Sequence, residues 1–198
     1  MSENYSISPS GEKFPLPKPE DYMTEFESLK KRVELERAKN REIVVVMGVG
    51  FVGAVMAAIV ADTVDRNNGQ PSKFVIGMQR PSARSFWKIP LLNRGISPVK
   101  AEDPEVDPMI ARCVKEKQTL IATYTYDVLK LADVVVVDVQ CDYLKEDLGN
   151  VRSGQTDMAA LEASLHVIAQ HIPAEALVLI ETTVAPGTTE QVAYPIMK

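Results

Sequence analysis

The chain has 198 residues, of which 45% are hydrophobic and 25% charged, enough for one globular domain with a sizeable core. Its formal net charge of −5 argues against nucleic-acid binding through a basic surface, and we expect its two cysteines to be reduced intracellular thiols. With no apolar run of the ~18 residues that a membrane span needs and no signal-peptide core at its start, we expect a cytoplasmic protein without a nucleic-acid or membrane partner.

Residues 1–40 differ in character from the remainder of the chain. Residues 1–17 are rich in Ser, Pro, Gly and Lys, which predicts a flexible tail. Apolar residues then recur at i, i+4, i+7 and i+11, namely Tyr22, Phe26, Leu29 and Val33. This spacing predicts an amphipathic helix from Pro19 to about Asn40. The helix either docks on the domain or on a second subunit, or is simply a packed surface helix.

The stretch from Arg41 to Asp62 organises the rest of the chain. Ile43–Met47 is a continuous apolar run typical of a strand buried on both faces of a parallel sheet. A G-x-G-x-x-G turn follows, and an alanine-rich run, Ala54–Ala61, predicts a helix after it. In that context the motif indicates a dinucleotide site, with the pyrophosphate held at the helix N-terminus by Gly48, Val49, Gly50, Phe51, Val52 and Gly53. The alternative is a tight strand-to-helix turn that binds no ligand.

Further strands and helices alternate to the end of the chain. Strands are predicted at Phe74–Met78, Leu120–Thr123, Val134–Val139 and Leu177–Ile180, with helices near residues 82–93, 109–117, 126–131 and 157–171. We expect residues 141–154 to form a mobile loop close to the ligand. The pattern predicts an α/β doubly wound parallel sheet, Rossmann-like, formed by residues 41–198 and preceded by an N-terminal helical extension.

Ligands of such sheets bind at the carboxyl ends of the strands. The residues predicted there, besides the glycine turn, are Gln79, Arg80, Thr123, Gln140, Cys141, Thr182 and Thr183. Gln79 stands where an acidic residue usually accepts hydrogen bonds from the adenosine ribose. Arg80 could stack on adenine, meet a 2′-phosphate, or simply be a solvated loop residue, so NAD and NADP both stay open as cofactors.

Asp138 lies unusually within an apolar strand. It either faces the cleft or pairs with a donor inside the fold, and we favour the second interpretation. We predict no metal site, because His166 and His171 are five residues apart and so do not share a helix face. Cys113 and Cys141 likewise lack the spacing of metal ligands.

Four segments resemble the nucleotide-sugar dehydrogenase family, the UDP-glucose/GDP-mannose dehydrogenase group that includes UDP-N-acetylmannosamine dehydrogenases. MGVGFVG is similar to the family's cofactor loop, and LNRGISPVKAEDPEV to its Asn–Gly–Pro segment before an acidic loop. LIATYTYDVLKLADVVVVDVQCD resembles its Thr-containing strand, helix and next strand. ETTVAPGTTE, the most specific of the four, resembles the family motif E-S-T-V-P-P-G-T-T-E.

The resemblance implies an NAD-dependent oxidation of a sugar 6-hydroxyl to the aldehyde and then to the acid, through a thioester on an active-site cysteine. The family carries that cysteine in a G-G-x-C-type motif of its second half, which these residues lack. The resemblance therefore implies no catalytic residue in this chain and a nucleophilic cysteine downstream. It also implies a nucleotide-sugar substrate bound through the missing half, and a full-length homodimer built on a central helix.

Two departures indicate a divergent branch. Cys141 replaces a threonine that in the family lies near the nicotinamide and the sugar, and Gln79 replaces the acidic ribose reader. Two alternatives to the family reading stay open. One is the cofactor domain of a 3-hydroxyacid or 6-phosphogluconate-type dehydrogenase, against which ETTVAPGTTE argues. The other is a non-catalytic dinucleotide-binding module with the N-terminal helix as its partner surface.

Overall fold

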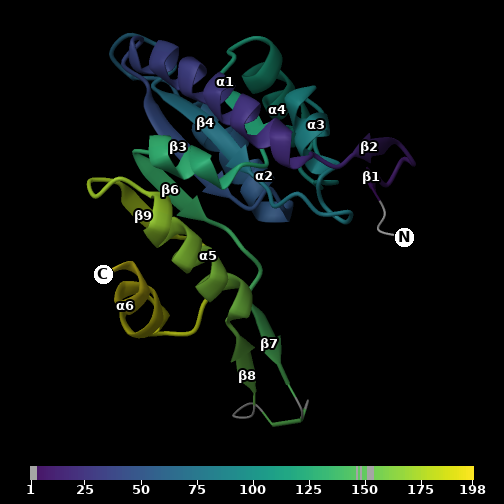
Figure 1. The fold of residues 1–198 in the computed structure, drawn as a ribbon, viewed down its shortest axis with the longest axis vertical. Helices are drawn as coiled ribbons and strands as arrows, with labels where there is room; N and C mark the ends of the chain where they lie inside the picture. The colour runs from purple at the N-terminus through teal and green to yellow at the C-terminus, as the bar shows by residue number, and fades with distance from the viewer. Residues whose placement is uncertain (1–3, 146, 148, 151–153) are drawn as a thin grey trace.

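A five-stranded parallel sheet forms the centre of the computed structural model, which describes residues 4–145, 147, 149–150 and 154–198 (Figure 1). Its strands are β3 (Glu42–Met47), β4 (Lys73–Met78), β5 (Leu120–Thr123), β6 (Val134–Val137) and β9 (Leu177–Ile180). Their spatial order is β5–β4–β3–β6–β9, with every neighbouring pair parallel. The predicted strands are confirmed, except that β6 ends two residues early, before Asp138.

Helices cover both faces of the sheet, which is why the central strands are apolar throughout. One face packs against α2 (Phe51–Asp62), α3 (Lys88–Asn93) and α4 (Val106–Lys115). The other packs against α1 (Pro19–Arg37), the 3₁₀-helix η1 (Tyr126–Leu131) and α5 (Ala159–His171), with the π-helical η2 (Thr189–Ala193) and α6 (Tyr194–Met197) beside them. The doubly wound fold and the N-terminal helix are therefore confirmed.

The chain reverses direction across the sheet at β3. From β3 it proceeds outward through β4 to β5, and it then returns to place β6 on the other side of β3. Diverging connections at the carboxyl ends of β3 and β6 leave a crevice there, the usual ligand position in such sheets. None of the helices within the described residues is both long enough and apolar enough to cross a membrane.

The N-terminal residues differ from the flexible tail expected for residues 1–17. They form an antiparallel hairpin of β1 (Tyr5–Ile7) and β2 (Lys13–Pro15), which lies beside α3 in Figure 1. The Ser6 hydroxyl is buried, donating to the Ala83 carbonyl at 2.9 Å and accepting from the Trp87 amide at 3.0 Å. Phe14 packs on Trp87 and Leu91. Composition indicated a tail because these contacts join residues some 80 positions apart.

The predicted amphipathic helix is confirmed as α1, which begins at Pro19 and ends at Arg37, three residues before the expected end. Leu29 and Val33 of the apolar stripe are buried against the sheet. The same face also buries Glu36, which has no exposed surface. Its carboxylate lies 2.6 Å from Arg41 Nη1, 2.9 Å from Lys39 Nζ and 3.0 Å from Arg32 Nε.

The predicted loop at residues 141–154 is replaced in part by a second hairpin. Its strands, β7 (Asp142–Leu144) and β8 (Gln155–Asp157), pair in antiparallel fashion and extend away from the sheet (Figure 1). Residues 146, 148 and 151–153 of the predicted loop lie outside the described residues. Helix α5 then starts at Ala159, whose amide donates to the Asp157 carboxylate at 3.1 Å.

Candidate cofactor-binding cleft

Two of the three motif glycines are required by close backbone contacts. Gly48 has φ +103°, and a Cβ there would lie 2.1 Å from the Asp138 carbonyl oxygen. A Cβ on Gly53 would lie 1.8 Å from the Gly48 carbonyl oxygen, so this glycine lets α2 approach the end of β3. Gly50, the N-cap of α2, is different, because a Cβ there would meet nothing within 4 Å. Gly50 therefore faces open space, through which the phosphate groups of a ligand can approach the protein backbone.

The open space belongs to a cleft of about 430 Å³ at the carboxyl ends of the central strands. Five predicted residues line it: Gly48, Gly50, Gln79, Arg80 and Gln140. Gln79 also braces the glycine turn, since its Oε1 accepts a hydrogen bond from the Val49 amide at 3.2 Å. Phe51 and Val52 are exposed on the first turn of α2 and do not line the cleft. These five residues therefore lie around one cleft, while the cofactor contacts predicted for them stay a prediction.

Thr123 is placed elsewhere. Its side chain is fully buried, donates to Glu25 Oε1 of α1 at 2.7 Å, and accepts from the Thr125 amide at 3.3 Å. Because α1 covers this strand end, Thr123 cannot contact a cofactor in this arrangement. The expectation failed because it was based on strand ends alone and took no account of the N-terminal helix.

The remaining predicted residues lie at the ends of β6 and β9. The Thr182 hydroxyl bridges the two ends, donating to the Val139 carbonyl at 2.8 Å and accepting from the Val139 amide at 3.1 Å. Thr182 thus has a structural role in this arrangement, while Thr183 is exposed beside it. Cys141 is a half-buried free thiol that follows Gln140 at the cleft wall.

Asp138 faces the cleft, contrary to the interpretation that it pairs with a donor in the fold. Its Oδ2 would lie 2.6 Å from a Cβ on Gly53, so the carboxylate lies against the first turn of α2. Within the described residues no hydrogen-bond donor or cation contacts this carboxylate. Burial, together with the negative charge of Glu181, raises the pKa of Asp138.

Other residues of the cleft were missed because they are not in the turn or at the ends of strands. Lys88, at the start of α3, and Tyr126, in η1, both line it. Helix α5 contributes one face, spaced at i, i+3, i+4 and i+7, through Ala160, Ala163, Ser164 and Val167. In the sequence, the row of small residues at helical spacing was the feature that could have predicted this wall.

We predict that Asp138→Asn strengthens cofactor binding and removes much of its pH dependence. A raised pKa means that the ionised carboxylate is disfavoured in the folded chain, and an approaching pyrophosphate disfavours it further. NAD affinity of the native chain should therefore rise as the pH falls toward this pKa. Titration calorimetry from pH 8 to pH 5.5 measures the effect, with a gain of about tenfold in affinity for the variant at pH 8, or about 1.4 kcal/mol.

The same variant should also be more stable than the native chain at pH 7, because it lacks a charge that folding penalises. This destabilisation is present above the raised folded-state pKa and disappears as the pH falls through it. Asp107→Asn, an exposed carboxylate on α4, is the matched control and should change neither quantity. An unaltered pH dependence in Asp138→Asn would contradict the prediction.

The thiols and histidines provide no alternative centre. Cys113 is buried, with Sγ 3.6 Å from the Ala58 carbonyl oxygen, and burial and the nearby Asp62 carboxylate raise its pKa to about 11. Such a thiol is a poor nucleophile at neutral pH. His171 Nδ1 contacts the Val167 carbonyl oxygen at 2.7 Å. The described part of the chain contains no group of three or more His, Cys, Asp or Glu arranged to hold a metal ion.

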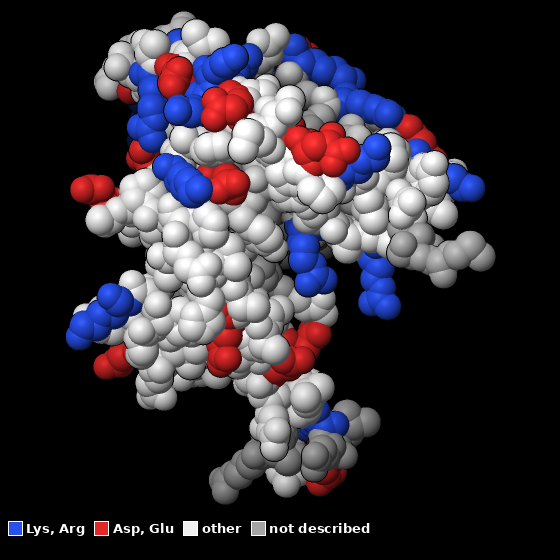
Figure 2. Space-filling view, in the orientation of Figure 1, with Lys and Arg blue, Asp and Glu red and all other residues white. Residues whose placement is uncertain are grey.

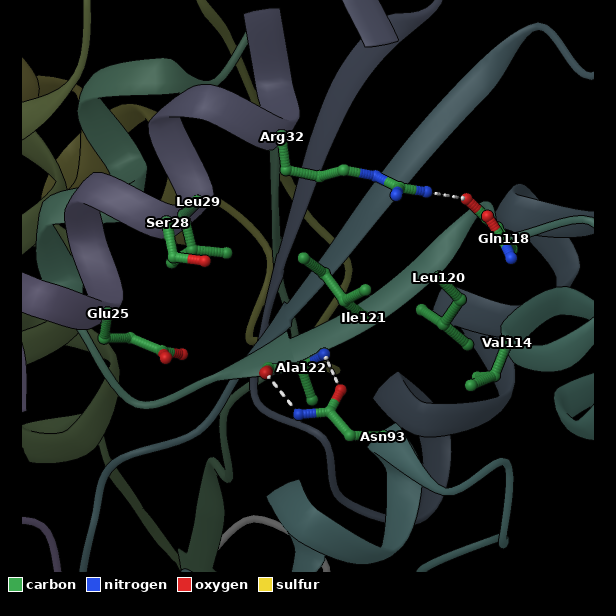
Figure 3. A pocket seen from close by; sticks show the side chains of 10 residues that line it. All are labelled: Glu25, Ser28, Leu29, Arg32, Asn93, Val114, Gln118, Leu120, Ile121 and Ala122. Carbon is green, nitrogen blue, oxygen red and sulfur yellow. Dashed lines mark hydrogen bonds between the residues drawn. The ribbon is translucent and has the colours of Figure 1, made fainter. Parts of the chain in front are cut away.

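A second cavity, of about 440 Å³, lies between α1, α4 and the outer edge of β5 (Figure 3). Asn93 closes that edge, since its amide group accepts from the Ala122 N–H at 2.6 Å and donates to the Ala122 carbonyl at 2.9 Å. Arg32 reaches across from α1 to the Gln118 carbonyl at 3.0 Å (Figure 3). None of the residues predicted to bind a cofactor lines this cavity, so the glycine-lined cleft is the candidate site.

The family comparison covers the sheet and its helices but not α1. A family model described as "UDP-glucose/GDP-mannose dehydrogenase family, NAD binding domain" matches residues 42–198. A comparison with curated proteins gives no match. Among solved structures, NDP-N-acetyl-D-galactosaminuronic acid dehydrogenase from Methanosarcina mazei is 30% identical, with a TM-score of 0.67, over 84% of this chain and 32% of that one.

Two more solved structures are similar. UDP-D-ManNAc dehydrogenase from Pyrococcus horikoshii is 27% identical with a TM-score of 0.59, covering 78% of this chain and 31% of its own. GDP-mannose dehydrogenase from Pseudomonas aeruginosa, at 24% identity and a TM-score of 0.59 over 78% of this chain and 31% of its own, shows the shared fold. The chain thus spans about a third of the length of these relatives.

Proposed function

This chain belongs to the UDP-glucose/GDP-mannose dehydrogenase family and contains its NAD-binding domain, and we propose that it is the cofactor half of an enzyme that oxidises a nucleotide sugar to its uronic acid. The single observation that carries the proposal is the turn at Gly50, where the backbone faces open space at the N-terminus of α2. The family match over residues 42–198 supports a division near residue 40, with residues 41–198 as the dinucleotide-binding domain.

The cleft residues suit a nicotinamide dinucleotide. The Gly48–Gly53 turn would hold the pyrophosphate against free amides and the positive end of the α2 dipole. Gln79, in the lining of the cleft, would read the adenosine ribose, and the small side chains of α5 would leave room for the rest of the molecule. Bound NAD would supply the hydride acceptor for the sugar carbon, while the protein's part is to orient it and exclude water.

We place the nucleophilic cysteine and the sugar site in a second half that follows this domain. Cys113 is too buried for a covalent role, and Cys141 follows Gln140 but does not itself line the cleft. The relatives, of which this chain covers 31–32%, support such a division. We further propose a homodimer of the full-length protein, and a cytoplasmic location consistent with its free thiols.

Two other functions remain as alternatives and are separated by one experiment. A non-catalytic dinucleotide-binding module would bind NAD in any context but never turn over a sugar. A cofactor domain of a 3-hydroxyacid or 6-phosphogluconate-type enzyme would bind NAD and act on those substrates when joined to its own second half. The match to the nucleotide-sugar family and the ETTVAPGTTE segment favour the first proposal over both.

Isothermal titration of the 198-residue chain with NAD and NADP, beside NADH formation from UDP- and GDP-sugars, tests the proposal. We expect cofactor binding at micromolar concentrations without turnover by this chain. Sugar oxidation should appear when the domain is expressed with the segment that follows it in its gene. Absence of any dinucleotide binding would refute the cofactor role, and turnover by the 198-residue chain would refute the division between two halves.

A further inference from the structure

The adenosine end of the cleft presents donors where NAD sites usually present an acceptor. In most such sites an Asp or Glu after the second strand accepts hydrogen bonds from the ribose hydroxyls. Here Gln79 Oε1 is already used by the Val49 amide, 3.2 Å away. Gln79 therefore offers a ligand its donating Nε2 group and one further lone pair of Oε1, without the negative charge of a carboxylate. A ribose with a free 2′-hydroxyl loses its usual carboxylate partner at this position.

Two cations line the same cleft, and the one carboxylate in its lining lies on the far side of β3 from the strand that precedes them. Arg80 and Lys88 both contribute to the lining, and neither forms a salt bridge with any residue that the structure describes. Asp138 is the one acidic residue of the lining, and it follows β6, on the opposite side of β3 from β4. No described carboxylate thus neutralises either charge, although Lys88 Nζ lies over the Trp87 ring, 6.0 Å from its centre.

Lys88 lies where a bound anion would stabilise the positive charge of its ammonium group. Its side chain is partly buried, and this burial lowers the pKa of its ammonium. Burial raises the pKa of the Tyr126 phenol, which also lines the cleft, and the charge of Arg80 partly offsets that rise. Figure 2 shows basic side chains that project into the hollow between the part of the molecule with α3 and the part with the β7–β8 hairpin.

Hydrogen bonds within the turn that follows β4 hold Arg80 in place. Ser85 Oγ donates to the Arg80 carbonyl at 2.9 Å, and it lies 2.7 Å from Ser82 Oγ. The Phe86 amide donates to the Ser82 carbonyl at 3.0 Å, which continues the turn toward α3 and Lys88. These contacts hold the two cationic residues on one short, ordered segment, so little ordering cost remains for binding an anion there.

We propose that this end of the cleft binds the 2′-phosphate of NADP and that the chain binds NADP more tightly than NAD. The proposal rests on the proposed function, which supplies the orientation of the dinucleotide, and it adds which cofactor is preferred. A phosphate dianion would receive charge-assisted hydrogen bonds from the Arg80 guanidinium and the Lys88 ammonium, together with the Gln79 Nε2 group. NAD would meet the same donors without a matching anion.

Titration calorimetry of the 198-residue chain with NADP and NAD at one salt concentration tests the preference. We expect NADP to bind at least tenfold more tightly, the size of one hydrogen bond to a charged group. Adenosine 2′,5′-bisphosphate and AMP provide the same comparison without nicotinamide, and the bisphosphate should also win by about tenfold. Binding of NADP should weaken more steeply with added salt than binding of NAD.

Single substitutions test which side chains produce the preference for NADP over NAD. Arg80→Gln and Lys88→Gln should each weaken NADP binding by about tenfold and NAD binding by much less. Arg84→Gln is the matched control, because Arg84 is an exposed cation on the same turn that does not line the cleft. Gln79→Glu keeps an acceptor for the Val49 amide and should reverse the preference toward NAD.

The outcomes separate this inference from the function on which it rests. Tight NAD binding with weak NADP binding would overturn the 2′-phosphate site and leave the dinucleotide site standing. Loss of NADP binding in Arg84→Gln equal to that in Arg80→Gln would overturn the assignment to the cleft residues. The native-chain comparison of the bisphosphate with AMP needs no variant, so it decides the matter even if a substituted chain does not fold.

Discussion

Gly53→Ala is expected to destabilise the fold by more than about 3 kcal/mol, at or beyond the upper end of ordinary overpacking. The new Cβ would lie 1.8 Å from the Gly48 carbonyl oxygen and 2.6 Å from Asp138 Oδ2. The first of these is a backbone atom at the end of β3, so α2 would have to move off the sheet to relieve the clash. Urea denaturation followed by circular dichroism measures the loss. It is a large share of the free energy of unfolding of a typical domain, which is roughly 5–15 kcal/mol.

Gly50→Ala is the matched variant, and the expected result is the reverse. A Cβ at Gly50 meets nothing within 4 Å, and the residue is the N-cap of α2 with an ordinary negative φ. Stability should change by no more than about 1 kcal/mol, the range of N-cap substitutions. Dinucleotide affinity should fall by at least about tenfold, because the methyl group occupies space where the pyrophosphate would approach. Unchanged affinity in Gly50→Ala would remove the main support for the cofactor role.

Glu36→Ala is expected to cost about 3 kcal/mol of unfolding free energy, in the range measured for breaking a buried ion pair. The Glu36 carboxylate has no exposed surface and contacts three cations. Lys39 is half exposed and can return to water, but the Arg41 side chain is only 11% exposed and would be left without its acceptor. The loss should therefore depend mainly on Arg41.

Urea midpoints of Glu36→Ala and of Glu34→Ala, an exposed neighbour on the same helix, provide the comparison. A double variant with Arg41→Met should regain part of the loss, because it removes the unpaired charge while retaining an apolar side chain. If Glu36→Ala and Glu34→Ala unfold at the same urea concentration, the cluster contributes nothing to stability and this account of α1 docking is wrong.

The sheet could be predicted from sequence because its strands are short apolar runs, each followed by a helix. Ile43–Met47 and the valines of β6 are of this kind, and the pattern needs no knowledge of distant residues. The N-terminal hairpin could not be predicted this way. Ser6 and Phe14 are buried only because Trp87 lies beside them, and composition contains no information on such a pairing.

The candidate site, like the fold, could be predicted from the sequence only in part. The rule that ligands bind at the carboxyl ends of strands found Gln79, Arg80 and Gln140, which do line the cleft. It also selected Thr123, which α1 covers, because the rule does not consider elements outside the repeating pattern. It missed Lys88, which reaches the cleft from the start of a helix.

Helix α1 has a consequence for how the chain matures. Its contacts join residues far apart in sequence: Arg32 with Gln118, 86 positions later, and Glu25 with Thr123, 98 positions later. A ribosome delivers the N-terminus first, so this helix emerges long before its docking surface has been synthesised. During that interval its apolar stripe is exposed, and a nascent-chain chaperone has a target there. Helix α1 would thus reach its final position only after its partners, up to Asp133, have been synthesised.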